Sequence, residues 1–320
     1  MQEKTIPVLK AAFEEEVFQG LTTFPKYLSS KYFYDEVGDK LFQDIMAMPE
    51  YYLTNTEFDI LQQHKTKICE LFGTNFSLFE LGAGDGKKTK ILLKHLLDKK
   101  TEFDYRPIDI STNALEQLKV SVNRELPKVT IKTLQGTYFE TLKNIDESGS
   151  KRKVILFLGS NIGNLLHPQA IDFLQKIRAI LNQDDMVFMG FDQKKNPQTI
   201  LEAYNDKTGI TEAFNKNILT RINNEMGGDF NLSNFIHWEV YDPESGTAKS
   251  YLVSKKEQEV SINTLNLKIH FDAWESIHTE ISQKYDDKVV AWLAEQSGLK
   301  IISQFADDEN LYKNYIFKRA

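Results

Sequence analysis

Cysteine is almost absent from this chain, whose 320 residues contain only Cys69. A single cysteine cannot form an internal disulfide, and with only six histidines it excludes a cysteine-rich zinc module. Cys69 stands in an apolar setting and is expected to be a small core residue. No apolar run approaches the ~18 residues of a membrane span, and the charged start leads into no signal segment. We therefore expect a cytoplasmic protein without membrane association or a bound metal.

An excess of basic residues is also lacking. Lys and Arg number 39 against 46 Asp and Glu, a net charge of −7, whereas a protein that coats nucleic acid shows a basic face. We therefore expect no nucleic-acid partner; the oligomeric state does not follow from the sequence, and we favour a monomer. At ~150 residues per domain the length predicts about two structural units, and no repeat or low-complexity linker interrupts the chain.

Glycine and proline are scarce, at 16 and 8 residues, so each glycine cluster is informative. Residues 1–56 are rich in aromatic side chains at helical spacing. From residue 76, short apolar runs alternate with helical patterns, which predicts a parallel sheet with helices on both faces. The expected strands and helices follow one another at 76–81, 89–97, 105–110, 114–126, 129–134, 154–158, 171–181 and 186–190.

This alternation stops after residue 192. A helical pattern covers 201–226, and the alternating segments 251–254 and 260–271 are typical of antiparallel strands. The first pattern returns at the end of the chain, with a helix at 289–297 and strands at 299–303 and 315–317. We therefore expect an α/β fold with two domains. A Rossmann-like domain is expected from residues 57–192 and 285–320, and a second, α+β domain from residues 1–56 and 193–284.

A glycine cluster, Gly82-Ala83-Gly84-Asp85-Gly86, follows Glu80 and Leu81 at the end of the first expected strand. Alternate glycines permit a sharp turn and a close approach of a ligand, and the next helix offers unpaired N–H groups. The third glycine stands one position too early for the dinucleotide pattern G-x-G-x-x-G, which disfavours an NAD-dependent oxidoreductase. Gly-x-Gly-x-Gly after an acidic residue is instead typical of S-adenosylmethionine (SAM) methyltransferases.

Polar groups also follow two other expected strands, at the sheet edge where open α/β sheets bind ligands. Asp109 ends the second strand, at the usual distance for a carboxylate that binds both ribose hydroxyls; alternatively, it caps the next helix. Asn164 lies in the glycine-bracketed loop after the fourth strand and offers an amide donor and acceptor. Its alternative role is to cap the helix that begins near Pro168.

Further motifs accompany these groups, in order and over nearly the whole chain. They are Tyr34-Asp35 with Phe42, Pro49-Glu50-Tyr51-Tyr52 with Thr56-Glu57, the Gly82 loop, Asp109, Gly159-Ser160-Asn161-Ile162-Gly163-Asn164, Leu201-Glu202-Ala203-Tyr204, Ala213-Phe214-Asn215-Lys216-Asn217 and Thr279-Glu280-Ile281-Ser282. Together they resemble the L-histidine Nα-methyltransferase family. These SAM-dependent enzymes make histidine betaine (hercynine) by successive methylations on the route to ergothioneine.

The resemblance implies a class I SAM-methyltransferase sheet, SAM as cofactor, an amino-acid substrate and no metal. The SAM-binding residues that it implies, together with the loop residues around them, are Gly82, Gly84, Gly86, Lys88, Asp109, Thr137, Tyr138 and Gly159. The substrate-binding residues that it implies are Tyr34, Phe42, Tyr51, Asn164, Tyr204, Ser250, Glu280 and Ser282. Among these, Tyr51 and Asn164 are the expected catalytic residues, because they orient the amine. Glu280 and Ser282 match the pair that binds the imidazole.

Two positions depart from the family pattern. Thr137 stands where the family tends to carry an Asp that contacts the adenine amino group. Ser250 stands where histidine-specific relatives usually place a Met beside the imidazole. The alternatives are therefore an Nα-methyltransferase of another aromatic amino acid or related amine, and a SAM- or amino-acid-binding protein without turnover. A nucleic-acid base methylase would carry an Asn/Asp-Pro-Pro-aromatic tetrad after the fourth strand, and this chain has none there.

Overall fold

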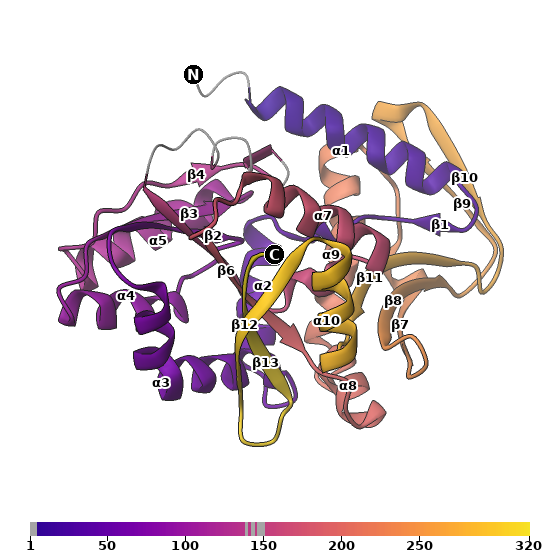
Figure 1. Cartoon of the computed structure of the whole chain (residues 1–320). Coiled ribbons are helices and arrows are strands. Elements are labelled where there is room, and N and C mark those ends of the chain that lie inside the picture. The colour runs from indigo at the N-terminus through magenta and orange to yellow at the C-terminus, as the bar shows by residue number, and fades with distance from the viewer. Residues whose placement is uncertain (1–4, 138–139, 142–144, 146–150) are drawn as a thin grey trace. The chain divides into compact units, whose positions relative to one another are not determined.

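The computed structural model describes residues 5–137, 140–141, 145 and 151–320. It contains two compact units, each made of two chain segments (Figure 1). One consists of Met1–Tyr51 and Asn196–Ser282, and the other of Tyr52–Lys195 and Gln283–Ala320. We name them the four-strand unit and the seven-strand unit after their larger sheets. The chain passes from one unit to the other three times.

The sheet of the seven-strand unit is mostly parallel. In spatial order its strands are β12 (Leu299–Ala306), β13 (Tyr312–Arg319), β6 (Met186–Asp192), β5 (Arg152–Phe157), β2 (Phe76–Leu81), β3 (Phe103–Asp109) and β4 (Leu134–Gln135). All pairs from β6 to β4 are parallel, and β13 is antiparallel to both its neighbours. The sheet confirms the α/β prediction, and it brings the carboxyl ends of β2, β3 and β5 to one edge.

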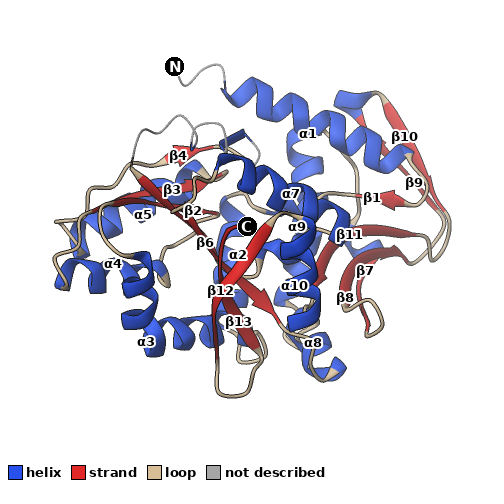
Figure 2. Ribbon diagram, viewed as in Figure 1, coloured by secondary structure: helices blue, strands red, loops and turns tan. Residues whose placement is uncertain are grey.

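Helices cover both faces of this sheet (Figure 2). They are α3 (Tyr52–Phe72), α4 (Thr89–Asp98), α5 (Thr112–Glu125), α7 (His167–Ile180) and α10 (Asp287–Gln296). Every residue of β2 is buried, because successive side chains enter opposite cores. Leu78 packs in the core that includes α3, α4 and α5, and Phe79 in the core that includes α7 and α10. Burial raises the pKa of the Cys69 thiol to about 12, as expected of a core cysteine.

The strand predicted at 129–134 is wrong in extent. Only Leu134 and Gln135 form a regular strand, paired with Ile108 and Asp109, and Ile131 makes one isolated bridge to Tyr105. The segment lies at the edge of the sheet, so it has one neighbouring strand, and the apolar residues Val129 and Ile131, whose alternation suggests a full strand, pack on the core.

The four-strand unit is α+β. Its sheet runs in the order β1 (Lys26–Tyr27), β11 (Ser276–Gln283), β8 (Thr247–Ser254) and β7 (Phe235–Asp242), beside a hairpin of β9 (Gln258–Ile262) and β10 (Leu267–Phe271). Its helices are α1 (Thr5–Thr22), α2 (Glu36–Ala47), α8 (Pro197–Tyr204) and α9 (Ile210–Met226), with short 3₁₀ turns η1 (Ser30–Phe33), η3 (Leu232–Asn234) and η4 (Asn263–Leu265). Neither β7 nor β11 is among the predicted strands, and the segment 260–271 is a hairpin.

The long helical pattern at 201–226 belongs to two helices. The helical conformation is interrupted between α8 and α9, where Gly209 has a φ of 79°. The Asp206 carboxylate there accepts hydrogen bonds from the N–H groups of Ile210 and Thr211, at 3.1 and 2.8 Å. This acidic cap and the glycine end the periodic pattern, although apolar spacing continues on both sides. Over the described residues, no helix combines the length and apolarity that crossing a membrane requires.

Candidate active site

Three glycines with positive φ form the loop that follows β2. The φ angles of Gly82, Gly84 and Gly86 are 69°, 52° and 64°, a region that other residues rarely adopt. A Cβ at Gly86 would overlap Leu118 of α5, so packing requires that glycine. At Gly84, no described residue other than the glycine and its two chain neighbours has an atom within 4 Å of the place a Cβ would take. The backbone is therefore open to a ligand at Gly84.

Asp109 ends β3 and lies against this loop. Its two carboxylate oxygens accept hydrogen bonds from the N–H groups of Gly84 and Ser111, at 3.0 and 2.9 Å. Helix α5 is capped by Ser111, whose hydroxyl accepts from the Ala114 N–H, so the alternative that Asp109 caps this helix is wrong. Burial raises the pKa of Asp109, and the backbone donors oppose that shift. The structure thus brings Gly84 and Asp109 together at one edge of the sheet.

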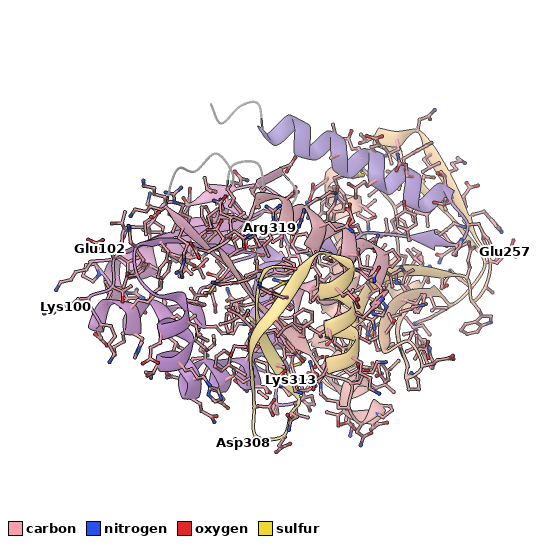
Figure 3. The ribbon with its side chains drawn as sticks, viewed as in Figure 1. Lys100, Glu102, Glu257, Asp308, Lys313 and Arg319 are labelled. Carbon is pink, nitrogen blue, oxygen red and sulfur yellow. The ribbon has the colours of Figure 1, made fainter. Side chains whose placement is uncertain are left out.

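The amino ends of strands β2 and β3 lie away from the glycine loop and Asp109. Lys100 and Glu102, labelled in Figure 3, stand in the turn between α4 and β3, at the amino end of β3. Because β2 and β3 are parallel, the glycine loop and Asp109 share the opposite edge, where ligands of open α/β sheets bind.

A buried carboxylate, Glu57 of α3, joins Lys88 to the loop after β5. One oxygen of Glu57 accepts from the Lys88 ammonium at 2.5 Å and from the Gly159 N–H at 2.7 Å. The other accepts from the Tyr312 hydroxyl and the Asn314 amide. Two expected SAM-binding residues, Lys88 and Gly159, are thus held by one side chain. Thr56-Glu57 is one of the motifs that carry the family resemblance, but the sequence analysis gives Glu57 no role in the site.

Glu80, the acidic residue before the glycine loop, serves the fold. It is buried and accepts hydrogen bonds from the hydroxyls of Thr89 and Tyr105. Burial raises the pKa of Glu80 to about 7, and these two hydrogen bonds reduce the shift. Glu80 therefore ties the first turn of α4 to β2 and β3.

Thr137 follows the edge strand β4. Its N–H and hydroxyl donate to the Glu140 carboxylate at 3.1 and 2.7 Å, and the neighbouring Gly136 N–H donates to the Asp109 carbonyl at 3.0 Å. The backbone at Thr137 thus lies beside Asp109. Tyr138, another expected SAM-binding residue, lies outside the described residues.

Asn164 ends the 3₁₀ turn η2 (Asn161–Asn164), which follows β5. The turn begins after Ser160, which has a φ of 56°. Asn164 is exposed, and no described residue forms a hydrogen bond with its side-chain amide. The cap of α7 is Leu166, so the capping alternative for Asn164 is wrong.

An aromatic cluster gathers four of the expected substrate-binding residues in the four-strand unit. The ring of Phe42 lies 5.5 Å from that of Tyr34 and 6.4 Å from that of Tyr51, centroid to centroid. Tyr51 lies 6.1 Å from Tyr204. Phe214 of α9, which the sequence analysis does not place in the site as a separate residue, packs on both Tyr34 and Phe42. These contacts join α2, α8 and α9 into one aromatic wall.

Polar groups meet this wall at Tyr204. Its hydroxyl lies 2.8 Å from the hydroxyl of Ser282 on β11, and both residues are buried. Two positions before Ser282 stands Glu280, partly exposed on the same strand. The structure therefore brings Tyr204 and Ser282, two of the expected substrate-binding residues, together.

Ser250 has a partner that the sequence analysis does not name. Ser250 on β8 and Glu239 on β7 are directly opposite across the strand pair, and the Ser250 hydroxyl donates to Glu239 at 2.6 Å. Both side chains are buried. A polar, acidic pair therefore stands where an apolar Met is usual in histidine-specific relatives.

The sheet order, the glycine loop and Asp109 at the carboxyl edge define a class I SAM-dependent methyltransferase. Comparison with known proteins then gives the family. A family model described as histidine-specific, SAM-dependent methyltransferase matches residues 13–319, so this chain belongs to that family and is a SAM-dependent N-methyltransferase.

The chain is 35% identical over 290 residues to histidine N-alpha-methyltransferase from Mycolicibacterium smegmatis, covering 90% of this chain and 89% of that protein. It is 31% identical over 289 residues to ergothioneine biosynthesis protein 1 from Neurospora crassa, covering 88% of this chain and 32% of that longer protein. A solved structure, the methyltransferase CcbJ from Streptomyces caelestis, is similar with a TM-score of 0.47 and 11% identity, over 82% of this chain and 96% of that chain.

Proposed function

We propose that this enzyme methylates the α-amino group of L-histidine, in successive steps that give histidine betaine. In this proposal residues of the seven-strand unit bind SAM, and the expected substrate-binding residues bind the amino acid. The observation that carries it is the Tyr204–Ser282 hydroxyl pair set against an aromatic wall. An aromatic amino acid with polar ring nitrogens requires both kinds of surface.

The residues at the carboxyl edge of the sheet fit SAM. The open backbone at Gly84 accommodates close approach of the nucleoside, and the Asp109 carboxylate has lone pairs left for both ribose hydroxyls. Lys88 and Gly159 both donate hydrogen bonds to the Glu57 carboxylate, which holds them close together. We assign the Thr137 hydroxyl oxygen as a hydrogen-bond acceptor for the adenine amino group. SAM supplies an electrophilic methyl group on a sulfonium centre.

The protein's own contribution is to orient a neutral amine. In a model peptide the α-amino group has a pKa of ~7.7–8.0, and the nearby sulfonium cation of SAM favours the neutral form of the substrate amine, so a strong base is not part of this assignment. We assign Tyr51 and Asn164 to hydrogen bonds with this amine, and Tyr204 and Asn164 to the carboxylate. Holding the lone pair in line can supply ~7–11 kcal/mol of the barrier.

The remaining side chains fit the rest of the substrate. Glu280 and Ser282 offer an acceptor and a hydroxyl to the two ring nitrogens of imidazole. The rings of Tyr34 and Phe42 suit the methylated amine, because aromatic faces attract quaternary ammonium groups.

A second candidate follows from Ser250. The Ser250–Glu239 hydrogen bond puts a polar pair where histidine-specific relatives usually carry a Met, which would favour another aromatic amino acid or related amine with a further hydrogen-bond donor. The chemistry at the α-amine would be unchanged.

The test is to incubate the purified enzyme with SAM and a panel of amino acids, and to follow substrate mass. We expect L-histidine to gain one, two and then three methyl groups, and the highest kcat/KM within the panel. A higher kcat/KM for another aromatic amino acid would establish the second candidate. SAM binding with no methylated product from any member would contradict both.

A further inference from the structure

A buried charge cluster lies at the carboxyl end of β6, outside the residues assigned to SAM or the amino acid. It consists of Asp192, Tyr52, Lys195 and Lys284, and we name it the Asp192 cluster. The Tyr52 hydroxyl lies 2.9 Å from both carboxylate oxygens of Asp192, and the Lys284 ammonium lies 2.8 Å from one of them. Lys195 donates to the same carboxylate and, at 2.6 Å, to the Tyr52 hydroxyl.

Burial is nearly complete for the charges of this cluster. Asp192 and Lys284 have no exposed side-chain surface, and Lys195 has 7%. Burial alone would raise the pKa of Asp192, but Lys284 and Lys195 hold it below its usual value. Burial lowers the pKa of Lys195 to about 8, against the attraction of Asp192. Buried ion pairs add little net stability, because desolvation offsets their attraction. The position of the cluster in the chain is therefore its informative property.

Each partner of Asp192 stands beside a passage of the chain between the two units. The passages follow Tyr51, Lys195 and Ser282. Tyr52 is the first residue after one passage, Lys195 the last before another, and Lys284 the second after the third. One carboxylate thus holds the chain at all three places where it leaves or enters the seven-strand unit.

These same places border residues assigned to the substrate. Tyr51 directly precedes Tyr52, and Ser282 stands two residues before Lys284. The loop that carries Asn164 is held here too: the Asp192 N–H donates to the Ser160 hydroxyl at 3.0 Å.

We propose that Asp192 is a positioning residue for methyl transfer, because its carboxylate fixes the chain next to Tyr51 and Ser282 through Tyr52 and Lys284. The carboxylate itself touches neither SAM nor amino acid in this assignment. Its loss therefore changes how well the amine is aligned, and leaves the SAM-binding residues in place. The inference rests on the proposed function for the roles of Tyr51 and Ser282, whereas the tethering of the three passages stands independently.

The test compares Asp192→Asn with Asp104→Asn. Asp104 is a matched control: it is buried in the same unit and bound to Ser77 and Arg106, but it lies near the amino end of β3. With L-histidine as substrate, D192N should lower kcat by up to about 10²-fold, the loss that a 1 Å misplacement can cause, while SAM affinity stays unchanged. D104N should lose thermal stability and keep its kcat.

Two further variants cover the case in which D192N fails to fold. Tyr52→Phe removes one tether and no charge, so it should fold and still lower kcat. The double variant D192N/K284Q restores the charge balance, so its stability should recover while its kcat stays low. Recovery of kcat together with stability would overturn the proposal, because Asp192 would then serve only the charge balance.

Hydrogen exchange of the SAM-bound protein separates this proposal from the proposed function. In D192N, exchange should accelerate in peptides around residues 52, 195 and 284, and in D104N it should not. This readout needs no amino-acid turnover. Equal exchange in D192N and D104N would overturn the inference even if histidine is the substrate. A wild-type enzyme that methylates no amino acid would contradict the proposed function alone.

Discussion

Gly84 offers the sharpest test of the SAM site, because a methyl group there meets nothing within the described chain. Gly84→Ala would place an L side chain at a φ of 52°. The left-handed conformation costs about 1–2 kcal/mol, and the stiffer unfolded chain returns about 0.4–1 kcal/mol. The net loss of about 1 kcal/mol should lower Tm by a few degrees and leave the protein folded.

The effect on SAM should be much larger. If the nucleoside lies against the Gly84 backbone, the new methyl group overpacks the complex by about 1–3 kcal/mol, which weakens binding by about 5- to 150-fold. At a SAM concentration of 100 times the wild-type Kd, bound ligand stabilises the wild type by about 2.7 kcal/mol. A hundredfold weaker variant would gain only about 0.4 kcal/mol at that concentration. Titration calorimetry and SAM-dependent Tm shifts measure both quantities.

Gly209 provides the matched control. It has a φ of 79°, and a Cβ there also meets no atom of the described chain within 4 Å. Gly209 lies in the four-strand unit, before α9. Gly209→Ala should therefore show a similar loss of stability with unchanged SAM affinity. If Gly84→Ala binds SAM as tightly as Gly209→Ala, the nucleoside does not approach the glycine loop and the assignment of Gly84 is refuted.

Three further predictions concern single side chains. The pKa of Glu80 is about 7 in the folded protein, above its ordinary value of 4.5. Between pH 4.5 and 7 the folded protein therefore binds more protons than the unfolded protein, and the free energy of unfolding falls by about 3 kcal/mol as the pH rises through this range. Glu80→Gln should remove this loss. The free energy of unfolding in urea, variant minus wild type, should therefore be larger at pH 8 than at pH 4.5. The same difference at both pH values would contradict the prediction. Asn164→Ala should keep the Tm of the wild type, because the side chain is exposed and does not cap α7. The variant should lower kcat/KM for histidine by about tenfold or more, because hydrogen bonds to charged groups of the substrate are lost. Unaltered kinetics would show that Asn164 is not part of the site. Tyr204→Phe breaks the 2.8 Å contact with Ser282 and should raise KM for histidine without changing SAM affinity, which steady-state kinetics and calorimetry separate; an unchanged KM would count against this pair as substrate ligands.

The parallel sheet could be predicted because its signals are local. The run 154–158 is apolar at every position and the run 76–81 at all but Ser77 and Glu80, as is typical of strands buried on both faces, and glycines mark their ends. The break between α8 and α9 also had a local signal, Asp206 followed by Gly209, but the apolar spacing on both sides concealed it. Strands β7 and β11 had weaker signals, because polar residues occupy several of their positions.

The candidate site could be predicted only in part, for a related reason. Gly84 and Asp109 each end a strand, so the parallel pairing of β2 and β3 places them together once the sheet is assigned. Ser250 could be matched through family resemblance, but its partner Glu239 required the register of an antiparallel pair.

Buried charges were the part that local patterns could not reveal. Glu57 lies 31 residues before Lys88 and 102 before Gly159, yet it binds both; Asp192 gathers Tyr52 from 140 residues away. A carboxylate can be buried only where donors from distant segments surround it, so its surroundings are a property of the complete fold and not of its neighbours in sequence. For the same reason these two residues join segments that carry proposed ligand-binding residues: Glu57 joins the segments of Lys88 and Gly159, and the Asp192 cluster joins the passages of chain next to Tyr51 and Ser282. We therefore expect that neutralising either acid will impair catalysis, although neither carboxylate is assigned a contact with SAM or the amino acid.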